Sequence, residues 1–171
     1  TDGATLLTTK ESGRQERYLT AIEIETAVPR WQIALKNHYP DAGCHSPDGK
    51  QIVVCVNQEL WSVDVETGRR NWIGSHPLAV NDVQFVPRKG LIVTVCMDGK
   101  IRTWDPSTGR MVHEKAAHTN SAQQVAVSPD GQLLATAGED LLTRVWRISD
   151  WKEVAAFGLK YEAGSLWFAD E

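Results

Sequence analysis

The clearest pattern of apolar and polar positions in this chain runs from residue 125 to residue 148. Apolar residues alternate with polar ones at Val125 and Val127, return in a second run at 133–137, and return again around Trp146. Two turn-forming sequences separate the runs, Ser-Pro-Asp-Gly and then Gly-Glu-Asp. Alternation between turns is typical of half-buried strands, so the pattern predicts antiparallel β-strands and no helix.

The same pattern recurs along the chain with a period of about 41 residues. Within residues 76–117 the apolar runs predict four strands, near 83–85, 91–96, 100–105 and 110–114, joined by short turns. The markers of the period are Trp31 and Trp72 (41 residues apart), His76 and His118 (42), Trp104 and Trp146 (42), and the Ser-Pro-Asp-Gly turns at 46–49 and 128–131 (82).

A four-stranded unit of this length cannot bury both of its faces alone, so the copies must stack face to face. Units of four antiparallel strands stacked around an axis make a β-propeller, and each unit is then one blade. The sequence therefore predicts an all-β fold, a β-propeller of four-stranded antiparallel blades.

The repeat resembles that of the WD-repeat (beta-transducin-like) β-propeller family, in which a His, an Asp turn and a closing Trp-Asp recur. The third and fourth copies match this pattern well, although Arg147 replaces the final Asp of the fourth. The first two copies are degenerate, with Ile22 and Val63 at the Trp position, Asn57 at the Asp position, and His38 out of register. The matching residues are His76, Asp98, Trp104 and Asp105 in one copy, and His118, Asp140 and Trp146 in the next.

The resemblance implies a structural role for the matching side chains. In the family the imidazole bridges the turn carboxylate and the indole N–H, a donor that needs a partner when it is buried. We therefore expect structural His-Asp-Trp networks at His76, Asp98 and Trp104, and at His118, Asp140 and Trp146.

The two ends of the chain look like parts of one further blade. Residues 2–7 resemble the start of a second strand, and Phe168 lies 41 residues beyond Val127, in a first strand. This predicts four blades' worth of strands in a single propeller domain or half-propeller, 1–171, with one blade split between the termini. The pieces are about 1–35, 36–75, 76–117, 118–160 and 161–171, the last pairing with the N-terminal strands or with a second chain.

Two arrangements follow from the split blade. The chain is either a closed four-bladed ring or half of a ring that a second copy or further sequence completes. The resemblance implies seven or eight blades, which favours the half-ring. A head-to-tail homodimer would give an eight-bladed ring.

Composition limits the class of protein. The net charge of −4 argues against a nucleic-acid partner, and no apolar run approaches the roughly 20 residues of a membrane helix. We expect no targeting leader, since the first residues show no basic-then-apolar pattern. The three cysteines form no C-x-x-C pair, which favours a reducing, cytoplasmic location.

No catalytic or cofactor motif appears in the sequence, since H-E-x-x-H, phosphate-loop and G-x-S-x-G patterns are all missing. Trp31 and Trp72 resemble tryptophans that dock neighbouring blades in other propellers, and we do not interpret them as a sign of a quinone cofactor. We expect no enzyme activity, no cofactor and no metal.

The leading hypothesis is a non-enzymatic protein–protein interaction scaffold that binds partner proteins or peptides through its loops and rim. The alternatives are a sensory or regulatory propeller segment of a larger multidomain signalling protein and, third, a propeller enzyme with a central-channel site. The candidate interaction residues are Asn81, Asp82, Met97, Asn120, Gln123, Glu139, and, in a charged insertion, Arg14 and Arg17.

Overall fold

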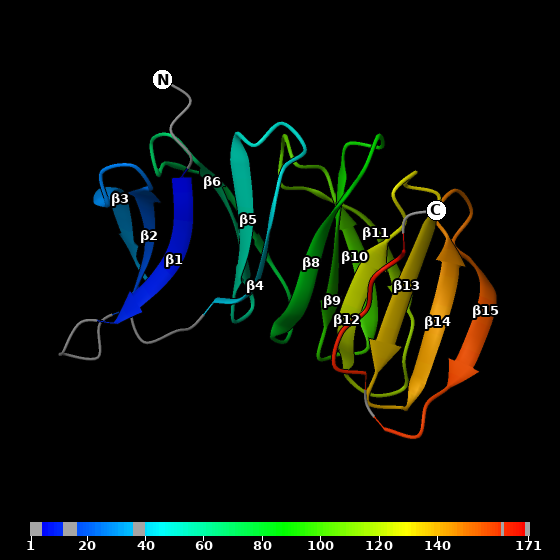
Figure 1. Ribbon diagram of the computed structural model, residues 1–171. Coiled ribbons are helices and arrows are strands. Elements are labelled where there is room, and N and C mark those ends of the chain that lie inside the picture. The colour runs from blue at the N-terminus through cyan, green and yellow to red at the C-terminus, as the bar shows by residue number, and fades with distance from the viewer. Residues whose placement is uncertain (1–4, 12–16, 36–39, 162, 170–171) are drawn as a thin grey trace.

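The computed structural model describes residues 5–11, 17–35, 40–161 and 163–169 of the 171-residue chain. Within these residues the chain forms fifteen antiparallel strands and no helix. The strands make four sheets that stand in a row (Figure 1). Consecutive strands are neighbours in every sheet, which is the meander that the repeat predicts.

We call the sheets A, B, C and D in chain order. Sheet A is β1 (Thr5–Glu11), β2 (Arg17–Glu23) and β3 (Val28–Ala34); sheet B is β4 (Pro40–His45), β5 (Gln51–Val56), β6 (Glu59–Asp64) and β7 (Arg70–Ser75); sheet C is β8 (Val80–Val86), β9 (Leu91–Cys96), β10 (Lys100–Trp104) and β11 (Met111–Ala116); sheet D is β12 (Ala122–Val127), β13 (Leu133–Gly138), β14 (Leu142–Arg147) and β15 (Lys152–Gly158).

The all-β propeller prediction is confirmed, because the four strands expected within residues 76–117 are β8 to β11. Of the blade that was predicted to be split between the termini, the structure shows the three N-terminal strands. Sheet A has three strands, and residues 163–169, which were expected to supply the fourth, form no strand. In Figure 1 the red segment overlaps sheet D in the view, at the opposite end of the row from sheet A.

The core consists of three apolar clusters, one between each pair of neighbouring sheets. Side chains alternate across a strand, so the second strand of a blade contributes to two clusters. In β9, Ile92 packs against sheet B together with Trp104, while Val93 and Val95 pack against sheet D beside Trp146. All five side chains are buried, so both faces of sheet C are closed by its neighbours.

A second contact ties each fourth strand to the turn between the third and fourth strands of the next sheet. The Trp31 indole N–H donates to the Val65 carbonyl at 2.8 Å, and that of Trp72 donates to the Pro106 carbonyl at 2.6 Å. At the same position of the next repeat, His113 stacks on Trp151 with ring centroids 4.6 Å apart. These rings hold neighbouring blades together at the rim.

The docked tryptophans require glycine beneath them. Gly109 has φ +69°, and a Cβ there would lie 2.8 Å from the Trp72 ring. Gly90 has a similar φ of +58°, but nothing lies within 4 Å of the position of its Cβ. Comparing substitutions at Gly109 and Gly90 therefore separates the cost of backbone strain from the cost of steric conflict with the Trp72 ring.

Gly109→Ala should therefore destabilise the protein by about 1–3 kcal/mol more than Gly90→Ala, which carries only the left-handed backbone penalty of about 1–2 kcal/mol. Urea unfolding of the two variants measures the difference. Equal unfolding free energies would show that the Trp72 ring does not fill the site of the missing side chain.

Candidate interaction face

A chain of hydrogen bonds runs from β14, the third strand of sheet D, to the segment that precedes β12, the first strand of the sheet. The Trp146 indole N–H donates to Thr136 Oγ1 at 3.0 Å, and Thr136 Oγ1 lies 2.9 Å from His118 Nε2. His118 Nδ1 lies 2.8 Å from Asp140 Oδ1. Strands β14 and β13, the segment before β12 and the β13–β14 turn thus each contribute one member.

An indole N–H can only donate, so Thr136 Oγ1 accepts from Trp146, and the same hydroxyl lies within hydrogen-bond distance of His118 Nε2. His118 Nδ1 faces Asp140 Oδ1 at 2.8 Å and the Arg144 guanidinium at 3.1 Å. Every polar group in the chain has a partner, which is what burial demands.

Burial lowers the pKa of His118, although the hydrogen bond to Asp140 acts in the opposite direction. Burial would raise the pKa of Asp140, but hydrogen bonds with His118 and Arg144 outweigh it and lower that pKa to about 2. Arg144 Nη1 lies 2.9 Å from Asp140 Oδ2. At neutral pH the site therefore holds a neutral imidazole and an ionised carboxylate that is balanced by arginine.

Sheet C repeats only half of this chain. Trp104 Nε1 donates to Thr94 Oγ1 at 2.9 Å, and Thr94 Oγ1 lies 2.9 Å from His76 Nε2. Asp98 is instead held by the guanidinium of Arg102, with contacts of 2.6 and 3.2 Å. His76 Nδ1 is buried without a hydrogen-bond partner in the described part of the chain, and burial with nearby Arg102 lowers the pKa of His76 to about 4.

The structure differs from the expected His-Asp-Trp networks in two respects. A threonine hydroxyl separates the imidazole from the indole in both sheets, and His76 makes no hydrogen bond to Asp98. Sequence reasoning missed Thr94 and Thr136, although they lie 42 residues apart at the same place in the second strand. Their identical spacing was the available signal.

Sheet B replaces the polar chain with apolar side chains. Leu35 occupies the place of His76 and His118, because its N–H donates to a carbonyl of the preceding sheet as theirs do. Val54 stands at the threonine position and Val63 at the tryptophan position, and both pack in one cluster with Leu35. His38, expected to be out of register, lies outside the described residues.

Two of the candidate interaction residues join neighbouring sheets. Asn81 Nδ2 donates to Ser121 Oγ at 2.9 Å and to the Ala122 carbonyl at 2.8 Å. Asp82 Oδ2 accepts the Val125 N–H at 2.9 Å. Burial raises the pKa of Asp82, against the effect of the hydrogen bond from Val125. These side chains therefore connect β8 to β12.

The other candidates lie on one face, which we call the linker face. It comprises the segments that lead into each first strand, such as 76–79 and 117–121, and the turns between second and third strands, such as 97–99 and 139–141. Met97 is 50% exposed there, and Leu78, which sequence reasoning missed, is 44% exposed in the adjacent segment. Asn120 and Glu139 are exposed, and the Gln123 side-chain amide donates to the Glu139 carboxylate at 2.7 Å. Arg17 is the first residue of β2, and Arg14 lies outside the described residues.

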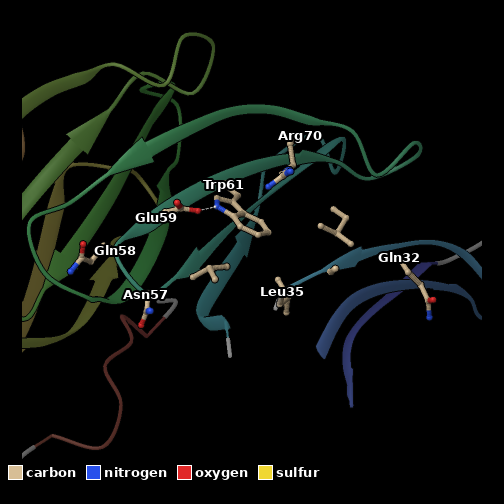
Figure 2. A pocket seen from close by; sticks show the side chains of 10 residues that line it. Gln32, Leu35, Asn57, Gln58, Glu59, Trp61 and Arg70 are labelled. Atoms are coloured by element: carbon tan, nitrogen blue, oxygen red, sulfur yellow. Dashed lines mark hydrogen bonds between the residues drawn. The ribbon is translucent and has the colours of Figure 1, made fainter. Parts of the chain in front are cut away.

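A pocket of about 890 Å³ opens between β3 and sheet B (Figure 2). Trp61 takes the register position of Arg102 and Arg144, and its indole N–H donates to Glu59 at 2.6 Å. Arg70 stacks over the Trp61 ring at 4.7 Å. The pocket thus combines an apolar wall with an arginine at its edge.

No group of three or more His, Cys, Asp or Glu residues gathers as a metal site within the residues that the structure describes. The same residues contain no helix long and apolar enough to cross a membrane. Burial raises the pKa of the Cys44 thiol to about 12, so this thiol is protonated at neutral pH and a poor nucleophile.

Thr136→Val should lower the free energy of unfolding by about 1–3 kcal/mol, since it leaves the Trp146 N–H and His118 Nε2 without a partner. Thr143→Val, on the opposite face of sheet D, is the matched control and should change stability by less than about 0.5 kcal/mol. Equal effects in urea unfolding would contradict the role of the Thr136 hydroxyl.

Stability should fall as the pH drops from 6.5 towards 4, because unfolded His76 takes up a proton that the folded site rejects. His76→Leu copies Leu35 of sheet B and should remove on the order of 2 kcal/mol of this loss at pH 4.5. Unfolding midpoints at pH 7 and pH 4.5 measure the effect. An unchanged pH dependence would show that His76 is not held neutral.

Comparisons with known proteins bear on the family. A family model described as outer membrane protein assembly factor BamB, of a propeller family, matches residues 1–156. Nuclear distribution protein PAC1 of Arthroderma otae is 30% identical over 152 residues, 81% of this chain and 30% of the relative. Protein groucho of Drosophila melanogaster is 26% identical over 126 residues, 71% of this chain and 17% of the relative.

MST50-interacting protein 11 of Pyricularia oryzae is 26% identical over 104 residues, 61% of this chain and 31% of the relative. The chain spans less than a third of the length of each of these relatives. The curated relatives are WD-repeat proteins, and the stacked four-stranded sheets have the architecture of a propeller. The chain therefore belongs to the propeller family of the matching model and is a WD-repeat β-propeller chain.

Proposed function

We propose that this chain is a non-enzymatic interaction module that binds partner proteins or peptides through its linker face. The observation that carries the proposal is the pair of exposed apolar side chains, Met97 and Leu78, on a face built from rigidly held turns. The Met97 N–H donates to the Ala79 carbonyl at 3.0 Å, which holds the two segments together. Methionine adapts its shape to different partners, so it suits a protein-binding surface.

The polar chemistry of the described blades supports a structural role and not catalysis. The imidazole of His118 and the carboxylate of Asp140 are engaged with each other, and Asp98 is held by Arg102. Asn81 is engaged with the neighbouring sheet. Both ring nitrogens of His118 are engaged within the fold and its side chain has no exposed surface, so the imidazole is not within reach of a substrate.

One relative is named for its interaction with another protein, MST50, which supports the proposed class of function. All three relatives are much longer than this chain. This supports the second candidate function, in which the propeller is a sensory or regulatory segment of a larger multidomain protein. We further propose a cytoplasmic location, supported by three cysteines that are all free.

A second copy of the chain is a further proposed partner. Sheet A has three strands where the other sheets have four, and sheets A and D each turn one face away from the row. A head-to-tail homodimer would place sheet D of one copy against sheet A of the other and complete an eight-bladed ring.

Met97→Asp combined with Leu78→Asp should abolish capture of partner proteins by the immobilised chain, because a charge at the centre of an apolar contact costs several kcal/mol. Met111→Asp with Val112→Asp, both exposed on β11, is the matched control and should leave capture unchanged. Captured proteins are identified and quantified by mass spectrometry. Equal loss with both double variants would contradict binding through the linker face.

A further inference from the structure

The third strands of sheets C and D each carry an arginine whose charge is neutralised within the sheet. In sheet D, Arg144 lies 2.9 Å from Asp140 of the preceding turn and 3.2 Å from Glu153 of the fourth strand. Arg102 of sheet C is held in the same way, by one carboxylate from the turn and one from the fourth strand. Neither arginine therefore has charge left for a ligand.

Sheet B has the opposite distribution of charge at the same positions. Trp61 stands at the register position of Arg144. Arg70 stands at the position of Glu153, since each of them pairs with the residue at the tryptophan position of its sheet. The turn before β6, residues 57–58, contains no carboxylate. Sheet B therefore has a cation where sheet D has an anion.

The guanidinium of Arg70 is held by a ring and not by a carboxylate. It lies over the Trp61 ring, 4.7 Å from the ring centroid. Arg70 forms no ion pair with the residues that the structure describes, and its N–H groups have no acceptor among them. Stacking uses the flat face of the guanidinium, so the N–H donors at its edge stay available to a ligand.

The carboxylate of Glu59 lines the same pocket but does not neutralise Arg70. It accepts the Trp61 indole N–H at 2.6 Å, and the Trp61 ring lies between it and Arg70 (Figure 2). Glu59 begins β6 and Arg70 begins the antiparallel β7, so their backbones are about 13 Å apart along the strands. Glu59 thus fixes the ring, and the charge of Arg70 remains uncompensated.

The rest of the pocket is suited to a peptide. Its apolar wall is formed by Ile33, Leu35, Val56 and Trp61, which belong to the cluster between sheets A and B. Gln58 lines the pocket and is exposed, and its amide can both donate to and accept from a peptide backbone. The volume of about 890 Å³ lies within the range of roughly 300–1,000 Å³ that is typical of ligand sites.

We infer that this pocket binds a short acidic peptide segment of a partner protein, with a large apolar side chain against the apolar wall and a neighbouring carboxylate on Arg70. A carboxylate accepts two parallel hydrogen bonds from a guanidinium. The Trp61 ring holds the guanidinium in place before binding, which reduces the entropy lost on association. The site is separate from the apolar pair of the linker face, since neither Met97 nor Leu78 lines it.

Selection of random short peptides on the immobilised chain, followed by fluorescence anisotropy with the selected synthetic peptides, tests the site. We expect peptides with Asp or Glu beside a large apolar residue. Arg70→Gln should raise their dissociation constants on the order of 10- to 100-fold, because a charge-assisted bidentate contact is lost. Arg69→Gln is the matched control and should leave binding unchanged, since Arg69 is exposed, does not line the pocket and donates to Asn71.

Changing the acid of a selected peptide to its amide should weaken binding to the wild-type chain by the same factor and cause no further loss with Arg70→Gln. Equal binding of the acid and amide peptides, or equal binding by Arg70→Gln and the wild-type chain, overturns the inference. A selection without such acidic peptides overturns it as well. If every selected peptide depends instead on Met97 and Leu78, the pocket inference fails while binding through the linker face stands.

Discussion

The burial of both faces of each sheet is the constraint on which the rest of this structure depends. The second strands of the blades, β5, β9 and β13, are buried along almost their whole length. A strand with apolar side chains on both faces needs cover on both sides, which sheets B and C receive from a neighbouring sheet on each side. The turns, the docked tryptophans and the hydrogen-bond chains all stabilise this row of stacked sheets.

The polar chains show how one position in the repeat depends on the others. A buried indole N–H needs an acceptor, which the threonine hydroxyl supplies, and the same hydroxyl pairs with the imidazole. Sheet B drops tryptophan, threonine and histidine together, and its Val63, Val54 and Leu35 pack as one apolar cluster. Keeping one polar member alone would leave an unsatisfied group, so the set changes as a unit.

The two outer sheets, A and D, each have a neighbouring sheet on one face only within the described residues. Sheet D is covered on one face by sheet C, and the small, buried side chains of Ala135 and Ala137 lie on its other face. Sheet A packs Leu19 against sheet B, while Leu6 stays 52% exposed. Sheets A and D therefore each have one face that no other sheet of the described residues covers.

The sequence by itself determined the period, the strands and the turns, because these depend on residues that are close together in the chain. Markers such as Trp104 and Trp146 were sufficient to predict stacked four-stranded blades. Only the tertiary structure decided that threonines join tryptophan to histidine, that Leu35 stands in a histidine position, and that Asp82 binds the backbone of the next blade. It also decided that residues 163–169 form no strand with sheet A. The hydrogen bonds of the threonines, the histidines and Asp82 join positions 10 to 43 residues apart, and their geometry depends on how the strands pair and the blades stack, which no local pattern encodes.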